Sequence, residues 1–263
     1  QLDVQMTILS LGLNNHDASI NLDDLVALIP SYFKEWLKAI DHKTFKFCTR
    51  GYKSAEVLDK LSINNILPLG CPSYFYNKFP KIYIDDYNNN DLTIFNGVFC
   101  NKKSKNHIYT IQDERILFEI LSGKKYQKSD YAYFYNMSEL YADDIMSHKD
   151  LNKVKYFFNF SSAKDIYINA KLSIGSRIHG GVASLSCGVP AIITNHDLRA
   201  TEMCEFLNIP HFPKLGFTEG SDFGESINLM DLLASVSFDK YNLTYDEKYT
   251  NFIDFKKSFM DIL

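Results

Sequence analysis

Short apolar segments alternate with longer amphipathic ones along most of this 263-residue chain. Residues 44–49 alternate apolar and polar side chains as a strand does, and residues 54–61 carry apolar side chains at helical spacing. Residues 63–69 return to a strand pattern. A strand–helix–strand order of this kind indicates parallel sheets covered by helices, so we predict an α/β fold class.

The same order recurs in the rest of the chain. We predict further strands at residues 4–13, 91–99, 107–112, 131–135, 154–160, 171–175, 191–194 and 211–215. We predict further helices at residues 23–40, 113–121, 137–147, 163–170, 182–187, 197–207, 222–235 and 245–263. Pro30 should break the first of these helices in two, and Ser161 and Ser162 are expected to cap the helix that starts at Ala163.

Residues 78–90 are the best candidate for a linker, because they combine Pro80 with an Asp pair and a run of Asn. They separate two blocks of strand–helix pattern, which predicts two Rossmann-like domains with parallel sheets facing a central cleft. The N-terminal domain is predicted at residues 1–79, joined by the C-terminal helix 241–263. The C-terminal domain is predicted at residues 80–240.

Composition excludes several classes of protein. The net charge of −4 gives no basic field for nucleic acid, and no apolar run reaches the roughly 20 residues of a transmembrane helix. The five cysteines are odd in number and lack C-x-x-C spacing, which indicates reduced thiols rather than a disulfide frame or a zinc site. The chain begins with Gln1 and shows no signal peptide, which is consistent with a trimmed chain in a reducing compartment.

Acidic pairs at residues 23–24, 85–86 and 143–144 are candidate metal ligands. None follows a convincing apolar strand with D-x-D spacing. We therefore interpret them as helix caps and solvated loops, and we predict no metal site.

The chemistry concentrates in residues 171–194, which read as strand, polar turn, small-residue helix and strand. Gly188 is expected to end that helix in the left-handed conformation. The turn at Ser176–Gly181 should lie at the carboxyl edge of a parallel sheet, where open α/β sheets bind ligands. Its side chains Arg177 and His179, with the N–H groups of Gly180 and Gly181, predict a site for phosphate or carboxylate.

A second strand-end turn carries Arg50, and a third is the loop Gly70–Ser73. Each candidate also has a structural interpretation. Arg177 would then pair with a neighbouring carboxylate, His179 would hydrogen-bond its own loop, and Arg50 would tie two helices together.

These motifs together resemble the polysaccharide pyruvyl transferase family. The resemblance rests on the turn Ser176–Gly180, the helix that ends in Cys187-Gly188-Val189-Pro190, and Arg199 after it. Upstream it rests on residues 49–61 and on residues 69–73. Order and spacing agree over roughly residues 43–215. One departure is the turn after the first strand, where the Gly- and Asn-containing pattern is reduced to residues 11–15.

The resemblance implies a GT-B-like fold and transfer of pyruvyl from phosphoenolpyruvate to two hydroxyls of a sugar, giving a cyclic ketal. The N-terminal domain would then bind the acceptor and the C-terminal domain the donor. No cofactor is implied beyond phosphoenolpyruvate as co-substrate. The implied catalytic residues are His179, as the proton-transfer group, and Arg177. The donor-binding residues would be Arg50, Ser176, Arg177, His179, Gly180, Gly181 and Arg199, and the acceptor-binding residues Asn15, His16 and Ser73.

This function belongs to polysaccharide biosynthesis, as for exopolysaccharide or capsule in the cell envelope. The acceptor would be a polysaccharide or its lipid-linked precursor, and the expected location is cytoplasmic, at the inner face of the membrane if the acceptor is lipid-linked. Two alternatives stay open: a GT-B-type glycosyltransferase that uses a nucleotide sugar, and a non-catalytic carbohydrate-binding α/β protein.

Overall fold

The structure is a computed structural model that describes residues 6–15, 17, 19–87, 90–96, 106–111, 153–157, 159–195, 197–213 and 229–260. The predicted elements at 113–121, 131–135 and 137–147 lie outside these residues, as does His16.

The chain divides into two compact units. Unit 1 comprises Gln1–Lys78, Asn195–Ile209 and Asp239–Leu263, and unit 2 comprises Phe79–Thr194 and Pro210–Phe238. Residues 195–209 thus group with the N-terminal part, although the sequence pattern placed them within 80–240. The reason is a contact that is distant in sequence, since Leu198 packs into the core of unit 1.

Unit 1 is built on a three-stranded parallel sheet. Its strands lie in the order β1 (Met6–Leu11), β2 (Thr44–Thr49), β3 (Ile66–Pro68). Its helices are α1 (Leu22–Leu28), α2 (Ser31–Asp41), α3 (Tyr52–Lys60), α8 (Leu198–Leu207) and α11 (Asp239–Met260), with the short 3-10 helix η1 (Pro72–Tyr74). The break between α1 and α2 falls at Pro30, as predicted.

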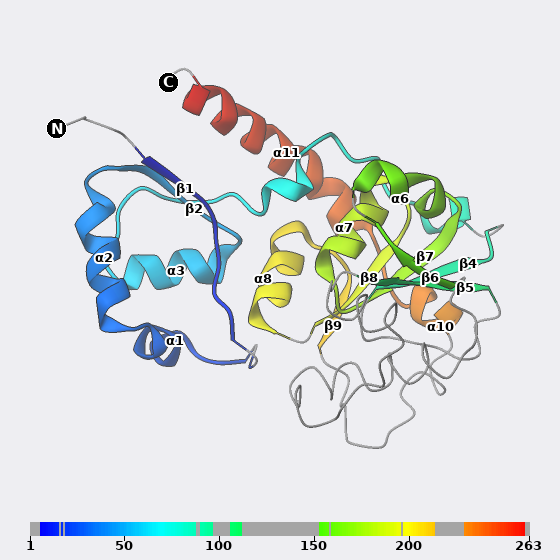
Figure 1. Ribbon diagram of the computed structural model, residues 1–263, viewed down its shortest axis with the longest axis horizontal. Helices are drawn as coiled ribbons and strands as arrows, with labels where there is room; N and C mark the ends of the chain where they lie inside the picture. Colours follow the sequence, from blue (N-terminus) through cyan, green and yellow to red (C-terminus); the bar gives the residue numbers. More distant parts are fainter. Residues whose placement is uncertain are drawn as a thin grey trace. The chain divides into compact units, whose positions relative to one another are not determined.

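The core of unit 1 forms where the helices cover this sheet (Figure 1). Phe47 of β2, Val57 and Leu58 of α3 and Leu198 of α8 share one buried cluster. Burial of such side chains contributes about 1.5–3 kcal/mol each. The amphipathic pattern of residues 54–61 therefore faces the sheet as expected.

Unit 2 is built on a six-stranded sheet. The strands lie in the order β6 (Val154–Tyr156), β5 (His107–Ile111), β4 (Leu92–Asn96), β7 (Ala170–Gly175), β8 (Ala191–Asn195), β9 (His211–Pro213). Its helices are α6 (Phe160–Tyr167), α7 (Ile178–Ser186) and α10 (Leu229–Ala234), with the 3-10 helix η2 (Ile84–Tyr87). Helices α6 and α7 lie along the sheet in Figure 1, and α6 packs on Ile94 of β4.

The strand order of unit 2 is that of a Rossmann fold. The chain starts in the middle at β4, goes outward through β5 and β6, and returns to the other side of β4 with β7. The order therefore reverses between β4 and β7, and open sheets bind ligands at the carboxyl ends of the strands beside such a reversal. With two parallel sheets flanked by helices, the structure confirms the predicted α/β, GT-B-like fold class.

Several element ends differ from their predictions because caps and backbone contacts decide them. Helix α6 is capped by Asn159, whose side chain accepts from Ser162 N at 2.9 Å, and not by Ser161 or Ser162. Helix α7 begins at Ile178, four residues before its predicted start, so it includes both glycines of the turn. It ends as predicted, with Gly188 at φ 85°.

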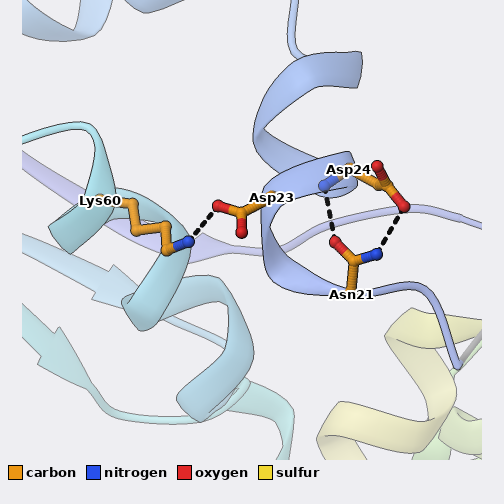
Figure 2. A network of polar contacts seen from close by, with 4 residues as sticks. All are labelled: Asn21, Asp23, Asp24 and Lys60. Atoms are coloured by element: carbon orange, nitrogen blue, oxygen red, sulfur yellow. Dashed lines mark hydrogen bonds and ion pairs between the residues drawn. The ribbon is translucent and has the colours of Figure 1, made fainter.

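The acidic pair at residues 23–24 stabilises a helix end (Figure 2). Both side chains lie in the first turn of α1, where negative charge is favourable. Asn21 caps this helix by accepting from Asp24 N at 2.9 Å, and its amide donates to Asp24 Oδ2 at 2.6 Å. Asp23 pairs with Lys60 of α3. The pair thus lies in the first turn of a helix whose N-cap is Asn21, so it supports the helix start without being the cap itself.

Candidate functional site

The turn after β7 occupies the place in unit 2 where the fold favours a ligand. Arg177 is the N-cap residue of α7, and its backbone N–H donates to the carbonyl of Asn96 at 3.1 Å. Asn96 is the last residue of β4, so this bond joins the two strand ends on either side of the reversal. The side chain of Arg177 is half-buried and that of His179, in the first turn of α7, is exposed.

Gly175 makes this close approach of the two strand ends possible. Its φ is 152°, a backbone conformation that residues with a side chain rarely adopt. A Cβ at this position would lie 2.0 Å from the carbonyl oxygen of Asn96. The turn that carries Arg177 therefore crosses the end of β4 with no room for a side chain.

A buried polar network lies around Asn96. Its amide nitrogen donates to the hydroxyl of Ser173 on β7, while its Oδ1 accepts from Thr110 on β5 and, at 3.1 Å, from Tyr167 on α6. All four side chains are buried. Burial raises the pKa of Tyr167 to about 12, so its hydroxyl stays a donor. Because every buried polar group here has a partner, the network holds the ends of three adjacent strands in one arrangement.

The two glycines of the turn differ from their predicted role. The N–H groups of Gly180 and Gly181 donate to the carbonyl of Arg177 at 3.0 and 3.3 Å, because the helix starts earlier than predicted. They are therefore committed to the helix and are not donors to a ligand. Gly181 instead permits close packing on the sheet, since a Cβ there would lie 2.4 Å from Cδ1 of Ile193.

Arg50 of unit 1 follows β2 and is held by the end of β1. Its backbone N–H donates to Leu11 O at 2.9 Å, and its Nε–H donates to both the carbonyl and the hydroxyl of Ser10, at 3.1 and 3.0 Å. A Cβ on Gly12 would lie 2.6 Å from Arg50 Cδ. Among the described residues no carboxylate forms an ion pair with Arg50. Its terminal nitrogens thus keep the fork geometry that suits an anion.

A buried carboxylate lies beside this arginine. Glu202 of α8 is 2% exposed and accepts from Ser54 N at 2.5 Å and from Ser54 Oγ at 2.7 Å. It therefore caps α3, and it does so from another helix. Burial raises the pKa of Glu202, while the bonds from Ser54 and the charge of Arg50 lower it. Gly51 gives Glu202 its room, since a Cβ there would lie 2.3 Å from Glu202 Cγ.

The other predicted residues of unit 1 have structural partners. Arg199 lies in the first turn of α8 with its Nη2 3.8 Å from Oδ2 of Asp197, the N-cap residue of that helix. The carbonyl of Asn15 accepts from Leu198 N at 2.7 Å, which ties the loop after β1 to α8. Ser73 donates to Sγ of Cys71 at 3.1 Å. Arg50 and Arg199 are thus in unit 1, whereas Ser176, Arg177 and His179 are in unit 2.

Among the described residues no group of three or more His, Cys, Asp or Glu side chains is placed to hold a metal ion. No helix in that same part of the chain has both the length and the apolar character needed to cross a bilayer.

The sequence patterns missed four residues that the structure places beside the candidates, namely Ser10, Ser54, Asn96 and Glu202. Only Glu202 had a readable signal. It stands four residues after Leu198 and four before Phe206, on the apolar face of an amphipathic helix. A carboxylate on such a face must find buried donors. The partners of the other three are distant in sequence and leave no local pattern.

Comparison with known proteins agrees with the motifs described above. The family model described as Polysaccharide pyruvyl transferase matches residues 28–197, which include Arg50, Arg177 and His179. A search of curated proteins finds no match. Since the matched residues make up more than half of the chain and carry both strand-end turns, the chain belongs to the polysaccharide pyruvyl transferase family.

Proposed function

We propose that this protein transfers a pyruvyl group from phosphoenolpyruvate to a sugar of a polysaccharide or of its lipid-linked precursor, forming a cyclic pyruvate ketal. The observation that carries the proposal is the turn after β7. There a half-buried guanidinium and an exposed imidazole both come from the first residues after a strand that lies beside the reversal of the sheet. Family membership supports the same reaction class.

The chemistry requires an anion site and a proton-transfer group. Arg177 supplies a fork of donors for the phosphate or carboxylate of the donor. Protonated His179 gives its proton to the methylene carbon of phosphoenolpyruvate, which leaves an oxocarbenium-like centre on the adjacent carbon. The first sugar hydroxyl forms a bond to that carbon and loses its proton, and the bond to the phosphate oxygen breaks. The second hydroxyl then closes the ring and releases its proton, so the products are the ketal and inorganic phosphate.

Arg50 and Arg199 are proposed as further donor-binding residues on the strength of the sequence motifs. The support for Arg50 is its geometry, because Nε is anchored on Ser10 and no described carboxylate forms an ion pair with its guanidinium. The guanidinium of Arg199 lies near the carboxylate of Asp197, so an anion that binds Arg199 would compete with that carboxylate. Asn15, His16 and Ser73 remain proposed acceptor residues, and His16 lies outside the described residues.

The test is an incubation with phosphoenolpyruvate and candidate β-galactoside, mannosamine or glucose acceptors, followed by phosphate release and acceptor mass. Phosphate release that depends on the acceptor, with a gain of pyruvyl mass, supports the proposal. Binding of a nucleotide sugar but not of phosphoenolpyruvate would indicate a glycosyltransferase. Binding of a glycan without turnover would indicate a non-catalytic protein.

Two variants test whether Arg177 and His179 act in turnover without contributing to the stability of the protein. Arg177→Ala and His179→Ala should lose turnover while keeping the thermal midpoint, because the side chain of Arg177 is only half-buried and that of His179 is exposed. The matched control is His42→Ala, which removes an exposed histidine after α2 in unit 1. Near-normal turnover in either turn variant would refute the assigned roles.

A further inference from the structure

One residue of β1 has a strained backbone with no local reason for it. Ser10 has a φ of 61°, and it lies inside the strand at Met6–Leu11, where the pairing of β1 with β2 shifts register between Ile8 and Leu11. A shift of this kind is a β-bulge, which bends a strand and re-aims its groups. Left-handed backbone at a residue with a side chain costs free energy that the surroundings must offset.

The other non-glycine residues with positive φ, among those described, occupy places where such a conformation is common. Ser62 comes directly after the C-cap of α3, and Asn208 is the C-cap of α8. Helices often stop with a left-handed residue. Asn65 is of the residue type that tolerates this conformation best, and it precedes β3. Ser10 is the one of the four that lies within a strand.

The consequence of the bulge is a double contact with Arg50. Both the carbonyl and the hydroxyl of Ser10 accept from Arg50 Nε, at 3.1 and 3.0 Å. Gly12, two residues on, lets the same side chain pass close to the backbone. A bond from a charged donor is stronger than a neutral one, and two acceptors on one N–H hold the guanidinium plane.

We propose that Ser10 is a positioning residue for Arg50, and that the strained bulge of β1 holds the guanidinium group of that arginine in one orientation for binding an anion. The inference rests on the proposed function, because it takes the anion to be phosphoenolpyruvate. It adds a residue outside the matched family region, which starts at residue 28.

The decisive variant is Ser10→Gly, which relieves the backbone and removes the hydroxyl in one change. Glycine adopts positive φ readily, so the thermal midpoint should stay the same or rise. The KM for phosphoenolpyruvate should rise by about tenfold with a smaller change in kcat, since one of two acceptors on a charged donor is lost. A merely structural role would predict no change in KM.

Two controls separate the hydroxyl from the backbone. Ser10→Ala removes the hydroxyl and keeps the strain, so it should show the same rise in KM with a lower thermal midpoint than Ser10→Gly. Ser62→Gly relieves an exposed serine at the same φ of 61°, and should leave KM unchanged. An unchanged KM in both Ser10 variants, or an equal rise in Ser62→Gly, would overturn the proposal.

A second measurement keeps this inference apart from the proposed function. The exchange rate of the Arg50 Nε–H proton, followed by NMR without any ligand, should rise several-fold in Ser10→Gly because the proton loses an acceptor. If the wild-type protein does not turn over phosphoenolpyruvate, the proposed function fails and the exchange rate still tests the anchoring of Arg50. Equal exchange rates in the wild type and in Ser10→Gly would overturn the inference about Ser10 even if turnover is found.

Discussion

Gly175→Ala is expected to damage the turn that carries Arg177. The new Cβ would lie 2.0 Å from the carbonyl oxygen of Asn96, 2.6 Å from its carbonyl carbon and 2.9 Å from its nitrogen. All three atoms belong to backbone, so no flexible side chain can move aside. Relief requires that the ends of β4 and β7 move apart by roughly 1 Å or more, to ordinary contact distance.

Two effects lower the free energy of unfolding of this variant. The φ of 152° strains any residue with a side chain by about 1–3 kcal/mol. Forcing an extra carbon into a packed region costs about 1–3 kcal/mol more. The expected destabilisation is therefore about 2–6 kcal/mol, a large share of the stability of an ordinary domain. The shift of the turn should also reduce turnover, since a misplacement of about 1 Å can cost about 100-fold in rate.

Urea unfolding followed by circular dichroism measures the first effect, and acceptor-dependent phosphate release measures the second. The matched control is Gly188→Ala, which changes a glycine of positive φ (85°) at the other end of α7. It should lose stability and keep far more of the turnover per folded molecule than Gly175→Ala. If Gly175→Ala were as stable as the wild type within about 0.5 kcal/mol, the close approach of the two strand ends described here would be refuted.

Three further predictions concern buried groups. Asn96→Ala should destabilise the protein by about 3 kcal/mol or more in urea unfolding, because three buried hydroxyl groups lose their partner. The control Asn90→Ala removes one hydrogen bond from a side-chain amide to a backbone carbonyl and should cost about 1 kcal/mol. Equal losses of stability in the two variants would contradict the network. Burial raises the pKa of Glu202 in the folded state, so its contribution to stability is present below the ordinary value of 4.5 and is lost as pH rises through the raised value. Stability measured against pH should therefore fall more steeply for the wild type than for Glu202→Gln between 4.5 and the raised pKa, whereas the exposed Glu205→Gln should follow the wild type. Parallel curves for all three proteins would refute the assignment. Burial raises the pKa of Cys48 to about 12, so a thiol reagent at pH 8 should label Cys48 only after unfolding, and mass spectrometry of peptides from the native protein would reveal any early labelling.

Much of the fold followed from local pattern. The strand at 44–49 has the predicted bounds, and Pro30 divides the first helical run where proline chemistry requires it. Gly188 ends α7 in the left-handed conformation, as its place after a small-residue helix indicated. Apolar residues that recur every two positions in a strand or every 3.6 positions in a helix, and the prolines and glycines that interrupt them, involve only a few neighbouring residues. The sequence alone therefore reveals them.

The ends of several elements were less predictable. Asn159, rather than the two serines after it, caps α6, because an N-cap is decided by which side chain reaches a free N–H group. The start of α7 at Ile178 turned two predicted ligand donors into helix donors to Arg177. Both differences are shifts of a few residues, yet the second changes which groups can contact a ligand.

The sequence by itself determined the fold class and the family, and it gave Arg50, Arg177 and His179 as candidate functional residues. Those conclusions need only the order of residue types along the chain. The tertiary structure alone decided what holds these side chains, through contacts such as Ser10 with Arg50, Ser54 with Glu202 and Asn96 with the turn after β7. The physical reason is that Glu202 and Ser54 are 148 residues apart in sequence, and a buried carboxylate takes whichever donors the fold brings to it.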